Sequence, residues 1–134
     1  MTPDYLLDTN TVSYYIAHNP LRVREELDRI GLDSTAVSAI TEAELRYGLA
    51  KNPLAARRRA SVESFLRNVL VYPWDSAVAQ RYGDLRAEQE RKGMSLSVED
   101  MMIAAHALAL GLTLVTRDGA FSFVEGLRTV DWTV

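Results

Sequence analysis

The chain alternates short apolar runs with longer segments of helical character, and this alternation limits its fold class more than any other feature. The apolar runs that predict strands lie at residues 5–8, 35–39, 69–72, 112–116 and 127–130. Each is short and bounded by turn or capping residues, which is typical of buried strands. Strands separated by helices run parallel in one sheet, with helices on both faces. We therefore predict an α/β fold built around a parallel sheet.

Capping and breaking residues predict where the helices begin and end. The predicted helices cover residues 11–17, 21–30, 41–50, 54–68, 76–92 and 98–110. Asn10 or Thr11 is suited to cap the first helix, and Asp75 and Ser97 are suited to cap the last two. Thr41 and Glu44 have the spacing of a capping box. No linker, internal repeat or low-complexity tract interrupts the pattern. We expect one domain over residues 1–134.

Four acidic residues lie where predicted strands end or helices begin. Asp8 closes the first apolar run, and Glu44 lies in the first turn of the helix after the second run. Asp100 opens the helix that leads into the fourth run, and Asp118 follows that run by two residues. The carboxyl ends of parallel strands share one edge of a sheet, where ligands bind. We therefore expect these four carboxylates to meet in one pocket.

Carboxylates that crowd together cannot all stay ionised unless a cation accompanies them. A site of oxygen ligands without sulfur or several histidines suits Mg²⁺ or Mn²⁺. The pattern therefore predicts a metal-dependent site for phosphoryl transfer or hydrolysis. Thr116 and Asn10 are expected to support this site, the threonine through a hydroxyl close to the carboxylates.

Each carboxylate also has a local interpretation that stays open at the level of sequence. Asp8 could cap the helix that follows it, and Glu44 could reach back to the Thr41 backbone. Asp100 has the same relation to Ser97, and Asp118 precedes a glycine, as turn aspartates commonly do. Four such coincidences at one edge of one sheet favour the shared pocket.

Composition excludes several other classes of protein. The 134 residues carry a net charge of −3 and no cysteine, so disulfides and thiolate zinc sites are excluded. Two histidines are too few for a histidine-rich metal site. The sequence has no apolar stretch of membrane-spanning length and no secretion signal at its start. We expect a cytoplasmic protein that does not enter a membrane.

The sequence around these acidic residues resembles that of a known family, the PIN-domain ribonucleases. It resembles more closely the VapC-type toxins of bacterial toxin–antitoxin pairs. The motifs that carry the resemblance are Leu6-Leu7-Asp8-Thr9-Asn10, Thr41-Glu42-Ala43-Glu44-Leu45-Arg46-Tyr47-Gly48, Asp100-Met101-Met102-Ile103-Ala104-Ala105-His106-Ala107 and Leu114-Val115-Thr116-Arg117-Asp118. The resemblance implies a PIN-like three-layer α/β/α fold with a central five-stranded parallel sheet. It also implies that Asp8, Glu44 and Asp100 are the principal metal ligands and Asp118 a fourth.

The resemblance further implies an activity and partners. The activity is endoribonuclease cleavage of RNA, for example transfer or ribosomal RNA, with Mg²⁺ or Mn²⁺ held by the carboxylates. The partners are a cognate VapB-type antitoxin and a second copy of the chain. Arg46 and Arg117 lie nearest the proposed pocket and are the predicted phosphate contacts. Arg57, Arg58 and Arg59 could contact phosphate, face solvent or meet the antitoxin, and His106 is expected at the surface or an interface.

Three other classes of protein share part of this pattern. A haloacid-dehalogenase-type phosphatase needs a second aspartate where this chain has Asn10. A receiver domain needs a lysine after a late strand, and neither Lys51 nor Lys92 is placed there. A catalytically silent PIN-like module that binds protein or RNA is the remaining alternative, although all four acidic positions are occupied.

Overall fold

A five-stranded parallel sheet organises the chain, and the computed structural model describes residues 2–94 and 96–134 of it. The strands are β1 (Tyr5–Leu7), β2 (Thr35–Ser38), β3 (Leu70–Tyr72), β4 (Thr113–Val115) and β5 (Thr129–Val130). Their order is β3-β2-β1-β4-β5, and every neighbouring pair is parallel. The predicted fold class is confirmed. The last strand is shorter than predicted, because only two of the residues in 127–130 pair with β4.

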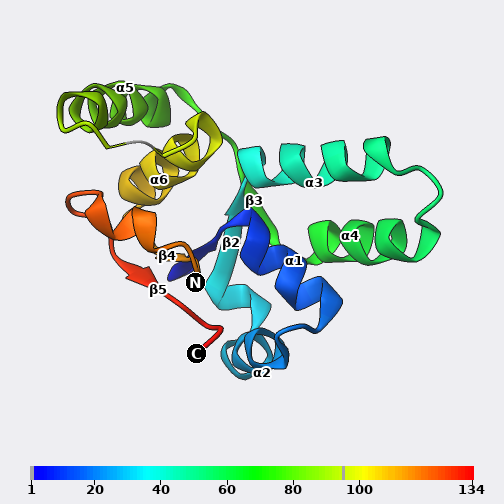
Figure 1. Cartoon of the computed structure of the whole chain (residues 1–134). Coiled ribbons are helices and arrows are strands. Elements are labelled where there is room, and N and C mark those ends of the chain that lie inside the picture. The colour runs from blue at the N-terminus through cyan, green and yellow to red at the C-terminus, as the bar shows by residue number, and fades with distance from the viewer. Residues whose placement is uncertain (1, 95) are drawn as a thin grey trace.

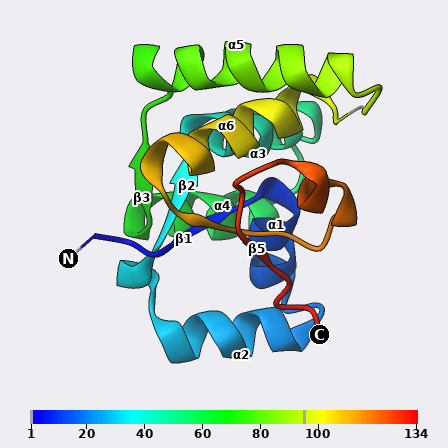
Figure 2. The same cartoon turned by 90° about the vertical axis from the view of Figure 1, so that its left-hand side faces the viewer.

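Helices cover both faces of this sheet, which gives three layers (Figures 1 and 2). The helices are α1 (Thr9–Ala17), α2 (Leu21–Ile30), α3 (Ala39–Lys51), α4 (Ala56–Asn68), α5 (Ser76–Arg91) and α6 (Val98–Leu110). Two short 3₁₀ helices, η1 (Leu32–Ser34) and η2 (Gly119–Phe123), were not predicted. Helices α5 and α6 lie on one face, and α1 to α4 on the other.

Successive strand residues point to opposite faces and so build two separate cores. Leu6 packs with Ile103 of α6 and Phe121 of η2 in one core. Leu7 packs with Val12 of α1 and Leu45 of α3 in the other. Because the sheet is covered on both sides, its strands are apolar runs rather than alternating ones.

The strand order places the site. From β1 the chain proceeds outwards to β2 and β3, and then crosses back to β4 on the other side of β1. The carboxyl ends of β1 and β4 are therefore at the point where the direction of winding reverses. Ligands of open α/β sheets bind in the crevice outside such a point.

Three of the predicted helix starts, those of α1, α3 and α4, are wrong by two residues, and the errors at α1 and α3 concern site residues. Helix α1 is capped by Asp8, not by Asn10 or Thr11, because the Asp8 carboxylate accepts a hydrogen bond from the Thr11 backbone at 2.8 Å. Helix α3 begins at Ala39 and is capped by Ser38. The Thr41-to-Glu44 capping box therefore does not form. The predicted caps Asp75 and Ser97 are confirmed.

His106 is buried, contrary to the expectation that it lies at the surface. Its ring is 1% exposed on α6, and its Nδ1 lies 2.8 Å from the Ser38 hydroxyl. Tyr72 meets the ring edge-on, with centroids 6.2 Å apart. Nothing in the local sequence distinguishes a buried histidine in an alanine-rich helix from an exposed one.

Over the described residues, none of the helices is both long and apolar enough to span a bilayer.

Candidate active site

Asp8 lies at the centre of the candidate site, directly after β1. Asp8 is only 5% exposed, and its backbone amide still bonds to Val115 in the neighbouring strand β4. Its carboxylate caps α1 and accepts hydrogen bonds from Thr11 and Thr116. Burial nevertheless raises the pKa of Asp8, and the negative charge of Asp118 raises it further. Both causes disfavour the ionised carboxylate, so a cation bound beside Asp8 would offset the cost of its charge.

Glu44 reaches the same edge of the sheet from the second turn of α3. Its Oε1 accepts a hydrogen bond from the Thr9 hydroxyl at 2.5 Å, and the Thr9 hydroxyl also lies 3.2 Å from that of Thr41. Since Thr9 is next to Asp8 in the chain, this contact ties Glu44 to the first strand. Thr9 was not singled out by sequence analysis; its position beside Asp8 was the available signal.

Asp100 and Asp118 complete the group from the other side of the sheet. Asp100 is half-buried in the first turn of α6, whose cap Ser97 accepts a hydrogen bond from the Asp100 backbone at 3.1 Å. Asp118 follows β4, and its carboxylate accepts a hydrogen bond from the Ala120 backbone at 2.9 Å as the cap of η2. The Thr116 hydroxyl accepts one from the Asp118 backbone at 3.0 Å.

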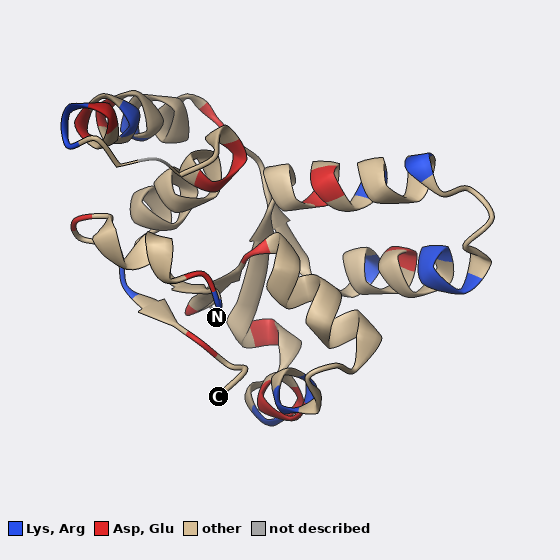
Figure 3. Ribbon diagram, viewed as in Figure 1, with Lys and Arg blue, Asp and Glu red and all other residues tan. Residues whose placement is uncertain are grey.

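The charges of the other three carboxylates reach Asp100. Burial is the main cause that raises the pKa of Asp100, and the charges of Asp118, Asp8 and Glu44 each raise it further. Figure 3 shows acidic positions at the start of α1, on α3 and at the start of α6, around the carboxyl ends of the strands. Residues that are up to 110 positions apart in sequence are thus brought into one negative region.

The donor set fits a hard divalent cation. Every candidate ligand is a carboxylate oxygen, which is what Mg²⁺ and Mn²⁺ prefer. Within residues 2–94 and 96–134 no three acidic or histidine side chains converge tightly enough to form a ready-made coordination shell. Mg²⁺ binds proteins through one or two carboxylates and keeps several waters, so a looser group of four is compatible with it.

The residues predicted to support the site or contact substrate differ in their surroundings. Thr116 is buried beside Asp8, whereas Asn10 is exposed in the first turn of α1. Arg117 is exposed directly after β4. Arg46 forms ion pairs with Glu42 and Glu63, each at 2.9 Å, on the side of α3 that meets α4. Its guanidinium is therefore less available for phosphate than that of Arg117.

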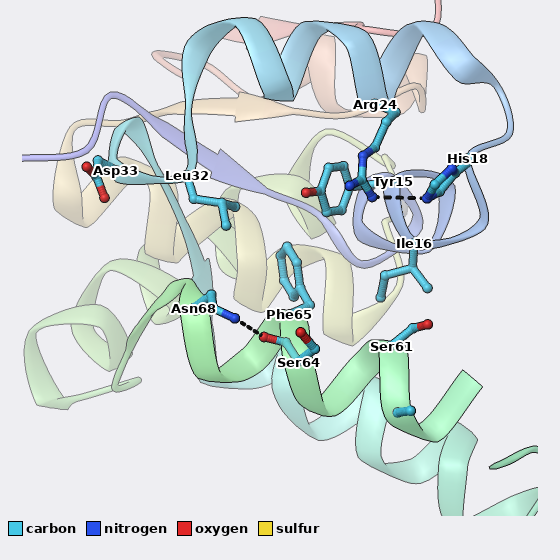
Figure 4. A pocket seen from close by; sticks show the side chains of 11 residues that line it. Tyr15, Ile16, His18, Arg24, Leu32, Asp33, Ser61, Ser64, Phe65 and Asn68 are labelled. Atoms are coloured by element: carbon cyan, nitrogen blue, oxygen red, sulfur yellow. Dashed lines mark hydrogen bonds between the residues drawn. The ribbon is translucent and has the colours of Figure 1, made fainter. Parts of the chain in front are cut away.

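A separate hollow of about 610 Å³ lies between α1, α2 and α4 (Figure 4). Arg24 crosses it, with its guanidinium 4.3 Å from the centre of the Tyr15 ring and Nη1 3.0 Å from His18 Nε2. None of the four carboxylates lines this hollow. It is distinct from the candidate active site.

Comparison with known proteins identifies the family. The PIN domain family model matches residues 5–127. The chain belongs to the PIN domain family. It is 37% identical over 129 residues to the tRNA(fMet)-specific endonuclease VapC of Shigella flexneri, across 96% of this chain and 97% of that protein. The Ribonuclease VapC2 of Haemophilus influenzae is 36% identical over the same shares of the two chains. The chain is therefore a VapC-type PIN protein.

Solved structures agree with this membership. The crystal structure of DNA-bound VapBC from Salmonella typhimurium superposes with a TM-score of 0.90 at 36% identity, covering 97% of this chain and 98% of that one. VapBC2 from Rickettsia felis, bound to a DNA fragment from its promoter, superposes with a TM-score of 0.87 at 30% identity. The superposition covers 98% of this chain and 99% of that one. The predicted family resemblance is confirmed.

Proposed function

We propose that this VapC-type PIN nuclease is a Mg²⁺-dependent endoribonuclease and the toxin of a toxin–antitoxin pair. The observation that carries the proposal is the placement of four carboxylates at the carboxyl edge of the sheet: Asp8 and Asp118 after β1 and β4, and Glu44 and Asp100 near the starts of α3 and α6. Such a group suits a divalent cation better than it suits any structural role. Mn²⁺ is an alternative occupant with the same ligand preferences.

Asp8, Glu44, Asp100 and Asp118 are the proposed catalytic residues, and they act by holding the metal. When bound, the metal supplies a Lewis acid that activates water and offsets charge on the scissile phosphate. Thr9 orients the Glu44 carboxylate, and Thr116 supports Asp8. The N-termini of α1 and α6 point their positive dipole ends into the same region, which favours an anionic phosphate there.

The substrate and partners follow from the relatives. Curated relatives are named as ribonucleases, one of them specific for a transfer RNA, which supports RNA as the substrate class and transfer RNA as a target. The similar VapBC complexes support a VapB-type antitoxin as partner. We further propose a homodimer, a single PIN-like domain over residues 1–134 and a cytoplasmic location. Arg117 is the better of the two predicted phosphate contacts, because Arg46 is engaged by two glutamates.

A catalytically silent module is the less favoured alternative. Such a protein would have no need of four acidic residues at the winding reversal of the sheet, and burial makes Asp8 costly to keep there. The four positions are all occupied in this chain.

Cleavage of a fluorogenic RNA in the presence of Mg²⁺ tests the proposal. We expect cleavage by the wild-type chain, loss of cleavage with a chelator, and at least a 100-fold loss in the variants Asp8→Asn and Asp100→Asn. Asp84→Asn on the exposed face of α5 is the matched control and keeps full activity. A wild-type chain that never cleaves RNA at any Mg²⁺ concentration, or an Asp8→Asn chain as active as the wild type, contradicts the proposal.

A further inference from the structure

The hairpin of α3 and α4 carries an unusual distribution of charge. Residues 45–62 contain five of the fifteen Lys and Arg side chains and none of the eighteen Asp and Glu side chains. Figure 3 shows basic positions at the far end of both helices of this hairpin. In a chain of net charge −3, this segment is a local region of positive charge.

Some of these cations lack a carboxylate partner. Arg46 is neutralised by Glu42 and Glu63. Among the residues that the structure describes, Lys51, Arg57 and Arg58 form no ion pair, and all three are exposed. Their charge is therefore available to an anionic partner.

Tyr47 lies on the same face of α3 as the active-site Glu44. Residues three and seven positions after Glu44 fall within about 60° of it around the helix, so Tyr47 and Lys51 extend in a row from the carboxylate pocket. Tyr47 is 65% exposed, which is unusual for a large aromatic side chain. The Lys51 ammonium lies 5.2 Å from the centre of the Tyr47 ring.

Arg58 adds a second cation, from the first turn of α4. Its Nη2 lies 3.4 Å from the Ser13 hydroxyl in the middle of α1. Arg59 turns instead to the end of α3 and donates to the Leu49 carbonyl at 3.4 Å. Tyr47 and Lys51 therefore lead from Glu44 to the end of α3, where Arg58 lies in the first turn of α4, and we call these three side chains the hairpin strip.

We propose that the hairpin strip binds the single-stranded RNA that flanks the scissile phosphate, with a base stacked on Tyr47 and phosphates held by Lys51 and Arg58. An exposed aromatic ring next to unpaired cations is the arrangement with which proteins hold single strands without reading their sequence. This inference rests on the proposed ribonuclease function, since it places the strip beside the same pocket.

The observations favour RNA over a protein partner. Two copies of a strip that contains only positive charges repel each other, so self-association through it is unfavourable. An acidic protein segment could satisfy Lys51 and Arg58, but it would give no reason for a bare tyrosine one helical turn from Glu44. A nucleotide satisfies both features, because it has a phosphate and a flat base.

Fluorescence anisotropy of a short labelled oligouridine tests the proposal. The protein is the full chain in the Asp8→Asn background with Mg²⁺, so that the RNA stays intact. We expect Tyr47→Ala to weaken binding about 10-fold through loss of stacking and Tyr47→Phe to bind as the parent does. Lys51→Ala and Arg58→Ala each lower the slope of log affinity against log salt by about 0.7. Arg91→Ala, on the far helix α5, is the matched control and changes neither value.

Each outcome decides for or against the strip. If Tyr47→Ala, Lys51→Ala and Arg58→Ala all bind oligouridine like the parent, the strip does not bind RNA. A Tyr47→Ala chain that binds normally but changes from dimer to monomer in sedimentation identifies a self-association surface instead. Failure of the ribonuclease proposal would give a different result. The strip variants would still weaken RNA binding, but the wild-type chain would not cleave RNA. All strip side chains are exposed, and a thermal melt checks that each variant is folded.

Discussion

At the scale of single residues, Asp8 combines two roles that the sequence presented as alternatives. It caps α1 and also faces the other carboxylates, because the strand ends immediately before it. The positions of Asp8, Asp100 and Asp118 could be predicted, since the sequence shows where strands end and helices begin. The contact of Glu44 with Thr9 could not, because it joins residues 35 positions apart.

Thr9 gives a test of how Glu44 is held. Thr9→Val keeps the shape of the side chain and removes the hydroxyl that donates to Glu44. A hydrogen bond to a charged group is worth about 2 kcal/mol, so we expect RNA cleavage to fall about 30-fold at saturating Mg²⁺. Thr129→Val, at the exposed start of β5, is the control. Equal cleavage rates for Thr9→Val and the wild type would show that Glu44 needs no such support.

His106 gives a test of pH dependence. Burial lowers the pKa of His106 below its ordinary 6.5, and the charge of Asp75 opposes this shift only in part. A lowered pKa means that the neutral ring contributes stability above about pH 6.5, and that this contribution is lost as the pH falls towards the lowered value. Asp8 and Asp100 have raised pKa values, so their contribution has the opposite sign and grows as the pH falls.

Comparison of His106→Asn with the wild type separates these contributions, since both chains retain Asp8 and Asp100. We expect the wild-type melting temperature to fall more than that of His106→Asn between about pH 7.5 and about pH 5.5. His18→Asn, at the exposed end of α1, serves as the control and follows the wild type. The same pH dependence in the wild type and in His106→Asn would mean that the buried ring does not titrate in this range.

At the scale of elements, the sequence predicted the existence of every strand and α-helix, but not all of their boundaries. Helix α3 starts two residues before the predicted Thr41, because the Ser38 hydroxyl accepts from the Ile40 backbone. Both Ser38 and Thr41 are good capping residues, and local sequence alone does not rank them. Because the helix starts early, Glu44 lies in its second turn. The Glu44 carboxylate therefore accepts from the Thr9 hydroxyl and not from the Thr41 backbone amide. Helix η2 was missed because it is a single short turn after Asp118.

The cap of α6 tests whether an element boundary fixes a site residue. Ser97→Ala removes the hydroxyl that accepts from the Asp100 backbone. We expect a loss of about 1 kcal/mol in the free energy of unfolding, with a melting temperature lower by about 3 °C, because one helix end loses its partner. Ser97→Asn restores a capping side chain and recovers most of the loss. If Ser97→Ala melts at the wild-type temperature, water replaces the cap at no cost.

At the scale of the whole molecule, the sheet order explains why distant acidic residues meet. The winding reverses between β1 and β4, so the loops after these two strands open beside each other, and α3 and α6 begin at the same edge. The parallel fold could be predicted from alternating elements. The strand order could not be derived from local pattern, because it depends on which helix crosses which face. The family resemblance implied five parallel strands but not their order.

The account depends on one property of the assembled molecule: its carboxylates repel one another and a divalent cation relieves that repulsion. Metal-induced stabilisation measures this property without reference to any RNA. The most direct measurement is the melting temperature of the wild-type chain and of the double variant Asp8→Asn/Asp100→Asn across a Mn²⁺ titration, with Asp84→Asn as control. A ligand at 100 times its dissociation constant adds about 2.7 kcal/mol to the folded state. We predict a melting temperature that rises by several degrees in the wild type and in Asp84→Asn and stays constant in the double variant. An equal rise in all three chains would contradict the account, because the metal would then bind elsewhere.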